Sequence, residues 1–303
     1  MDYNLGKLIT EQVNENTNHI DECSTEEILT LINHEDMKVA DAVRKVIPEI
    51  TRTVDTIVDS MQHGGRLFYF GAGTSGRLGV LDASECPPTY GVDPSLVQGY
   101  IAGGDQALRT AVEGCEDSVE LGRSEIEEHQ IQRGDVVVGI AASGRTPYVL
   151  GVVSRAKEIG AFTVGITTNP VNKLEEVVDV TIVPVVGPEV VTGSTRMKSG
   201  TAQKLVLNMI TTAVMIRLGK VYGNLMVDLK ASNEKLVDRA NRIFCSVTNM
   251  DEETARQYLI KSGMDTKLAI MMYLSGLEKK EAEKILQQNG GILKKALAKG
   301  DRK

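Results

Sequence analysis

The sequence predicts an α/β fold in which helices cover both faces of a mostly parallel central sheet. Short apolar, β-prone runs recur along the chain, and helical patterns fill most of the gaps between them. Two of these runs also end in turns of glycine and serine, as expected where parallel strands pass to helices at one edge of a sheet. The expected strands span about 66–70, 96–101, 135–140, 162–167 and 180–184.

Helices are expected before the first strand. The run Ser24-Thr25-Glu26-Glu27 is typical of a helix N-cap. A second helix should extend from about Asp41 to Gln62, where Pro48 is expected to bend or split it and Gly64-Gly65 to end it. The apolar residues expected on the buried face of the first helix are Ile28, Leu29, Leu31 and Ile32.

Between and after the strands, helical patterns cover about 105–121, 146–159 and 171–178. Pro147 suits the first position of the middle one. A long apolar helix should then extend from about Met197 to Leu218.

From about residue 249 the sequence consists of short amphipathic segments. Thr248–Glu253 is a good helix start, and glycines at 263, 276 and 290–291 break the remainder of the chain into three expected short helices. A small helical bundle at the C-terminus is therefore expected. The predicted division is a helical segment over 1–52, the α/β domain over 53–245 and the bundle over 246–303.

The turn Gly71-Ala72-Gly73-Thr74-Ser75-Gly76 lies between an expected strand and an expected helix. Backbone N–H groups of such a turn converge on an anion at the helix N-terminus, and hydroxyls add further donors. A similar turn, Ala141–Thr146, follows a second strand, and Ser194-Thr195-Arg196 forms a third polar cluster. Together they predict a phosphosugar pocket. Its candidate binding residues are Gly73, Thr74, Ser75, Gly76, Ser143, Gly144, Arg145, Thr146, Ser194 and Thr195. Arg145 and Lys198 are candidate phosphate partners, and a surface role is the alternative for each.

Two alternatives compete with this hypothesis. The glycine spacing of the first turn also matches a dinucleotide fingerprint, which requires an acidic residue at the end of the next strand. Here that strand ends in Tyr100–Gly104, and Asp105 comes only after two glycines. In the second alternative, the turns are simple connections between strands and helices and bind no ligand. A Walker loop is excluded because no Gly-Lys-Ser/Thr closes the first turn.

The composition of the chain argues against several classes of function. The formal net charge is −7, aromatic residues make up 4% of the chain and Trp is absent, which argues against a nucleic-acid partner. The cysteines and histidines are scattered, so neither a zinc site nor a disulfide framework is expected. With no signal peptide and no apolar run of about 18 residues, we expect a cytoplasmic protein that does not engage a membrane.

Carboxylates are the candidate acid–base groups. Glu85 precedes Pro87, which is expected to force the chain out of a helix and present the carboxylate to a ligand. The alternative is a solvated loop glutamate. Glu113, Glu116 and Glu120 fall at helical spacing, which is typical of an exposed acidic helix face. The pattern does not choose between Glu113 and Glu116.

Taken together, these motifs resemble the N-acetylmuramic acid 6-phosphate etherases. The resemblance implies a flavodoxin-like three-layer sandwich, the sugar isomerase domain, which binds phosphosugars without a metal or redox cofactor and commonly forms homodimers. It implies cleavage of the lactyl ether to N-acetylglucosamine 6-phosphate and D-lactate in cell-wall recycling. The family's catalytic glutamates correspond to Glu85 and Glu116. The stretches that carry the likeness are 71–79, 82–90, 111–117, 139–148, 189–198, 200–204 and 223–228.

The reaction that the resemblance implies begins with loss of the C2 proton of the open-chain sugar, which lets the ether oxygen at C3 leave. Glu116 is expected to remove that proton, and Glu85 to protonate the departing oxygen. A phosphosugar-sensing regulator similar to the glucokinase regulatory protein is the alternative from another class, and a sugar-phosphate isomerase is a third. The chain length, which fits a single sugar isomerase domain, and both glutamates favour the etherase.

Overall fold

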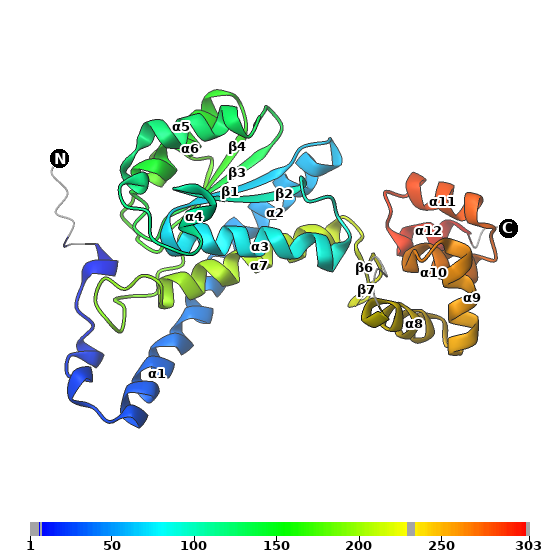
Figure 1. Cartoon of the computed structure of the whole chain (residues 1–303), viewed down its shortest axis with the longest axis horizontal. Coiled ribbons are helices and arrows are strands. Elements are labelled where there is room, and N and C mark those ends of the chain that lie inside the picture. Colours follow the sequence, from blue (N-terminus) through cyan, green and yellow to red (C-terminus); the bar gives the residue numbers. More distant parts are fainter. Residues whose placement is uncertain (1–5, 7, 229–233, 301–303) are drawn as a thin grey trace. The chain divides into compact units, whose positions relative to one another are not determined.

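A computed structural model describes residues 6, 8–228 and 234–300 (Figure 1). The chain forms two compact units, one of Met1–Ser84 with Pro94–Thr211 and the other of Glu85–Asp93 with Thr212–Lys303. Among the described residues, no helix combines the length and the apolar character needed to cross a membrane.

The first unit contains a five-stranded parallel sheet. Its order, β2-β1-β3-β4-β5, is that of flavodoxin-like folds and confirms the predicted α/β class. All five strands lie within a few residues of their predicted ranges, and β1 and β3, at the centre of the sheet, are runs of buried residues. The strands are β1 (Leu67–Gly71), β2 (Val97–Ile101), β3 (Val136–Ile140), β4 (Phe162–Ile166) and β5 (Val180–Ile182).

Helices cover both faces of this sheet. Phe68, Phe70 and Val137 pack in one cluster with residues of α5 (Val119–Glu128) and α6 (Pro147–Glu158). Figure 1 shows α3 (Gly73–Tyr90) and α7 (Lys198–Arg217) on the opposite side from α5 and α6. The unit is therefore a three-layer sandwich, and Pro147 opens α6 as predicted.

The N-terminal helices are split at the predicted place. A capping box of Ser24 and Glu27 starts α1 (Thr25–Arg44), and Pro48 lies in the first turn of α2 (Ile47–Gln62). The predicted apolar face of α1 is only partly buried, since Leu29 is 61% exposed while Ile28, Leu31 and Ile32 are half-buried. The buried residues of α1 are instead Glu35, Val39, Ala42 and Val43. Three 3-10 turns precede α1, at Ile9–Glu11, Glu15–Thr17 and Ile20–Glu22.

Three local predictions are wrong. The helix expected over 105–121 is replaced by α4 (Gly104–Ala107), a loop, a 3-10 turn at Cys115–Asp117 and the start of α5, because Gly114 takes a φ of +79°. Only a 3-10 turn, Leu174–Glu176, forms in the range 171–178. Pro87 does not end α3, which continues through it to Tyr90.

The second unit is helical apart from a short antiparallel pair, β6 (Val221–Tyr222) and β7 (Leu225–Met226). Gly263 and Gly276 end helices in the left-handed conformation, as predicted. Four helices rather than three follow residue 249 in the described part of the chain. The helices of this unit are α8 (Glu234–Thr248), α9 (Glu252–Ser262), α10 (Thr266–Ser275), α11 (Lys279–Gln288) and α12 (Leu293–Gly300).

Candidate functional site

A pocket of about 460 Å³ lies at the carboxyl edge of the sheet. β1 and β3 are neighbours there, with Gly71 paired to Ile140, and the strand order reverses between them. Such a reversal is where ligands bind in open α/β sheets. The predicted site residues that line the pocket are Gly73, Thr74, Ser75, Glu116, Ser143, Arg145, Thr146 and Thr195.

The first turn supplies the N-terminus of α3. Gly73 begins the helix with a φ of +54°, a conformation that favours glycine. The first amides of a helix have no intrahelical partner, so they are available to an anion in the pocket. Ser75 is 8% exposed, and its hydroxyl donates to Oε1 of Gln203 at 3.0 Å. Its oxygen is thereby fixed beside the turn.

The second turn is held by the segment after β4. The carbonyl of Ala142 accepts hydrogen bonds from the hydroxyl of Thr167 at 2.9 Å and from Nδ2 of Asn169 at 2.9 Å. Oγ of Ser143 accepts from the amide of Arg145 at 3.2 Å. These bonds fix the backbone at the entrance to α6, as expected for a preorganised ligand site.

Buried charged side chains hold the start of α7, directly after the third polar cluster. Oε2 and Oε1 of the fully buried Glu189 accept the amides of Lys198 (2.9 Å) and Ser199 (2.8 Å), which satisfies the N-terminus of α7. Lys198 is 1% exposed, and its ammonium lies 2.6 Å from Oε2 of Glu35. Lys198 is therefore half of a buried ion pair, and its predicted role as a phosphate partner is wrong. Burial alone would raise the pKa of Glu35, but hydrogen bonds from Lys198 and Lys38 lower it to about 2.

The N-terminal segment contributes a wall of the pocket that the sequence pattern did not predict. Thr10 and Glu11 line the pocket. Oγ1 of the buried Thr10 accepts from Asn169 at 3.2 Å, and its carbonyl accepts from the amide of Gly193 at 3.2 Å. Thr17 donates to the carbonyl of Val190 at 2.8 Å. No local sequence pattern predicts these contacts, because the two partners of each lie far apart in the sequence.

Four predicted site residues do not line the pocket. A Cβ on Gly76 would lie 2.6 Å from Cγ1 of Ile101, so this glycine lets α3 approach the sheet. Gly144 adopts a φ of +65° within the second turn, and the amide of Ser194 bonds to the carbonyl of Val191 at 2.9 Å. Glu85 is exposed, about three helical turns after Gly73 in α3.

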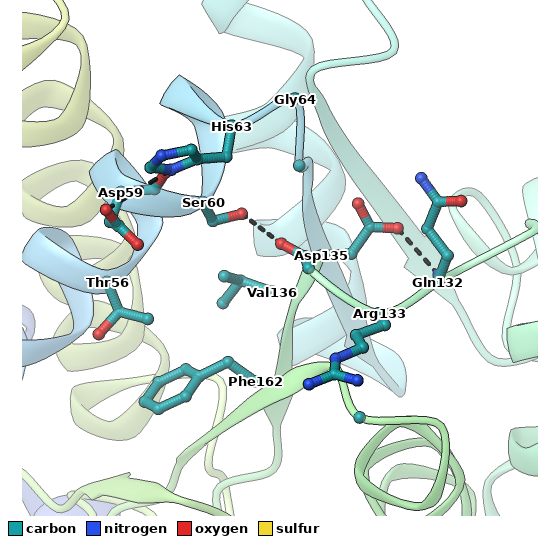
Figure 2. Close-up of a pocket in the computed structure, with 13 residues that line it drawn as sticks. Thr56, Asp59, Ser60, His63, Gly64, Gln132, Arg133, Asp135, Val136 and Phe162 are labelled. Atoms are coloured by element: carbon teal, nitrogen blue, oxygen red, sulfur yellow. Dashed lines mark hydrogen bonds and ion pairs between the residues drawn. The ribbon is translucent and has the colours of Figure 1, made fainter.

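A second pocket, of about 320 Å³, lies at the amino ends of the strands (Figure 2). The hydroxyl of Ser60 donates to the carbonyl of Gly134 at 2.6 Å. The carboxylate of Asp135 accepts from the backbone amide of Gln132 at 3.0 Å, a bond that Figure 2 shows as a dashed line. Asp135 is fully buried, and Arg66 binds both of its carboxylate oxygens. The carboxylate thus joins the starts of β1 and β3, which is a structural role.

Potential metal ligands are dispersed. Within the described ranges, no three His, Cys, Asp or Glu side chains are grouped so as to hold a metal ion.

Comparison with known families gives three matches. Residues 49–157 match the family model described as the glucokinase regulatory protein N-terminal SIS domain. Residues 122–213 match the SIS domain, and residues 223–270 match the C-terminal lid domain of glucokinase regulatory protein.

Close relatives extend over the whole chain. A protein of Clostridium beijerinckii named N-acetylmuramic acid 6-phosphate etherase is 56% identical over 300 residues, covering 99% of this chain and 99% of that protein. One of the same name from Glaesserella parasuis is 56% identical, covering 95% and 94%. The phosphoheptose isomerase structure from Neisseria gonorrhoeae aligns with a TM-score of 0.48 at 17% identity, covering 63% of this chain and 98% of that one.

Proposed function

The chain belongs to the N-acetylmuramic acid 6-phosphate etherase family, and on that premise we propose which of its residues carry out the reaction. The protein is a carbon–oxygen lyase that cleaves the D-lactyl ether of N-acetylmuramic acid 6-phosphate to N-acetylglucosamine 6-phosphate and D-lactate. The observation that supports our assignment is the pocket itself, in which two amide-rich turns and Glu116 face one another.

The phosphate is assigned to the turns after β1 and β3. Amides at the start of α3 and the hydroxyls of Thr74, Ser143 and Thr146 surround the same space. Thr146 is the N-cap residue of α6, and its side chain makes no capping hydrogen bond, so its hydroxyl is available to a ligand. Holding the phosphate in this way sets the distance of the sugar carbons from Glu116.

The reaction is an elimination followed by an addition. Glu116 takes the proton from C2 of the open-chain sugar, the C2–H electrons form the C2–C3 double bond, and the C3–O bond breaks. Glu85 protonates the departing lactyl oxygen. Glu116 then passes the C2 proton to solvent, and Glu85 takes a proton from solvent. The Glu116 carboxylate accepts a proton from the water that adds at C3 and returns a proton to C2. Each positioned acid or base contributes roughly 10²–10⁴-fold to the rate.

Glu85 is assigned to the reaction through a homodimer. Its side chain is exposed, and we assign it to the site of a second copy of the chain. We assign the dimer to the cytoplasm, as expected for an enzyme that acts on a phosphorylated sugar.

Release of D-lactate from N-acetylmuramic acid 6-phosphate by the purified protein tests the activity. Glu116→Gln and Glu85→Gln should each lower turnover by roughly 10²–10⁴-fold while leaving binding of N-acetylglucosamine 6-phosphate intact. Co-expression of the two variants should restore part of the activity if the glutamates act across subunits. No restoration would contradict the assignment of Glu85 to the second copy.

The matches to glucokinase regulatory protein models favour a phosphosugar-binding regulator as the second candidate. Binding of the substrate without lactate release would support the regulator. A product that keeps the mass of the substrate would instead indicate an isomerase.

A further inference from the structure

A small side pocket of about 120 Å³ adjoins the main one. The two pockets share three residues, Ala72, Gly73 and Glu116. The side pocket has room for a group of only a few atoms, since a water molecule takes up roughly 30 Å³ in the liquid. Glu116 therefore lies where a large and a small compartment meet.

The walls of the side pocket are small and apolar on one side. Ala102, Ala107, Ala111 and Val112 contribute methyl groups, and the first two of these residues are buried. None of these side chains is larger than valine, so a methyl-sized substituent fits against them without displacing the backbone.

Arg77 supplies the positive charge of the side pocket. Its Nε donates to the carbonyl of Leu108 at 3.0 Å, and its Nη2 donates to the carbonyl of Ala107 at 2.6 Å. These bonds fix the guanidinium on the loop, while Nη1 makes no hydrogen bond within the described ranges. A guanidinium held in this way is preorganised for a carboxylate.

We propose that this side pocket receives the lactyl group of the substrate and that Arg77 pairs with the lactyl carboxylate. The inference rests on the proposed function. A lactyl group carries one methyl and one carboxylate, which match the alanine wall and the guanidinium. With the sugar in the main pocket and the lactyl group in the side pocket, the C3–O bond lies at their junction, beside Glu116.

Arg77 also offsets the negative charges that surround the side pocket. Glu113 lines it together with Glu116, so two carboxylates oppose the entry of a third. Arg77 offsets this repulsion for a lactyl group that the sugar phosphate anchors. Free D-lactate lacks the anchor and is released readily.

The test compares the substrate with its lactamide analogue, in which an uncharged amide replaces the carboxylate. The wild type should prefer the acid by roughly 10- to 100-fold in kcat/KM, as expected for a charge-assisted hydrogen bond. Arg77→Gln should reduce this preference to about twofold. A purely structural role of Arg77 would lower both rates equally and keep the preference, which would overturn the proposal. Arg109 lies next to Leu108, whose carbonyl accepts from Arg77, but it does not line the side pocket. Arg109→Gln is therefore the matched control and should keep the preference.

A second variant tests the volume. Ala111 is exposed, so Ala111→Leu should fold normally while filling the side pocket. We expect lactate release to fall at least about tenfold, as for other misfits in a small apolar pocket, while inhibition by N-acetylglucosamine 6-phosphate, which has no lactyl group, stays unchanged. Thr110→Leu, one residue earlier and outside the pocket, is the control. An unaffected Ala111→Leu enzyme would refute the placement. Absence of lactate release from the wild type would instead refute the proposed function.

Discussion

Replacing Lys198 with methionine should destabilise the protein by about 3 kcal/mol. The ammonium of Lys198 lies 2.6 Å from Oε2 of Glu35, and these side chains are 1% and 4% exposed. Methionine fills a similar volume but leaves the carboxylate of Glu35 without its buried partner. Breaking a buried pair in this way costs about 3–5 kcal/mol. The remaining hydrogen bonds, from Lys38 and Asn16, place the expectation at the lower end of that range.

The lowered pKa of Glu35 predicts that the same contact makes the protein sensitive to acid. The pKa of Glu35 is about 2 in the folded protein instead of 4.5, which corresponds to about 3 kcal/mol of stability. Because the folded pKa is lowered, this stability is fully present above about pH 4.5 and is lost as the pH falls toward 2. The wild type should therefore lose stability between pH 5 and about pH 3 more steeply than Glu35→Gln.

Urea unfolding at pH 7 and at about pH 3 measures both effects. Lys38→Met is the matched control, since the Lys38 side chain is 51% exposed, and it should cost no more than about 1 kcal/mol. A cost of Lys198→Met no larger than that of Lys38→Met would refute the reasoning. So would equal acid sensitivity of the wild type and Glu35→Gln.

Three further changes test other parts of the structure. Gly76→Ala should lower stability by about 1–3 kcal/mol in thermal unfolding, because the new Cβ would lie 2.6 Å from Ile101 and 2.7 Å from the carbonyl oxygen of Gly71. Thr10→Val removes the acceptor of Asn169 and should loosen the N-terminal wall of the pocket, so steady-state kinetics should show a raised KM with little change in kcat. Asp135→Asn should cost about 3 kcal/mol in urea unfolding, because it leaves the Arg66 guanidinium without its carboxylate partner.

The sheet and its two glycine-serine turns were predictable from sequence because their signals are local. A buried strand carries a continuous apolar run, and a turn that needs a left-handed residue carries glycine, as at Gly73 and Gly144. The prediction at Pro87 was wrong for a different reason. Ala83 and Cys86 are buried on the same helix, and this packing keeps α3 helical through the proline.

Contacts between distant segments were not predictable. Thr10 meets Asn169, and Lys198 meets Glu35, across more than 150 residues of sequence in each case. Thr10 and Glu35 are polar residues, so hydrophobic periodicity gives no sign that they are buried. One wall of the pocket therefore became visible only in the folded chain.

We propose Glu116 rather than Glu113 as the base, a choice that the sequence pattern left open. Gly114, with a φ of +79°, separates the two, so they do not share the helix face that their spacing indicated. Both carboxylates line the side pocket, but only Glu116 also lines the main pocket. A base that takes the C2 proton must reach the sugar, whereas a group confined to the side pocket reaches only the substituent. Loss of the Glu113 carboxylate should therefore alter how the lactyl group is held, and loss of the Glu116 carboxylate should stop the chemistry.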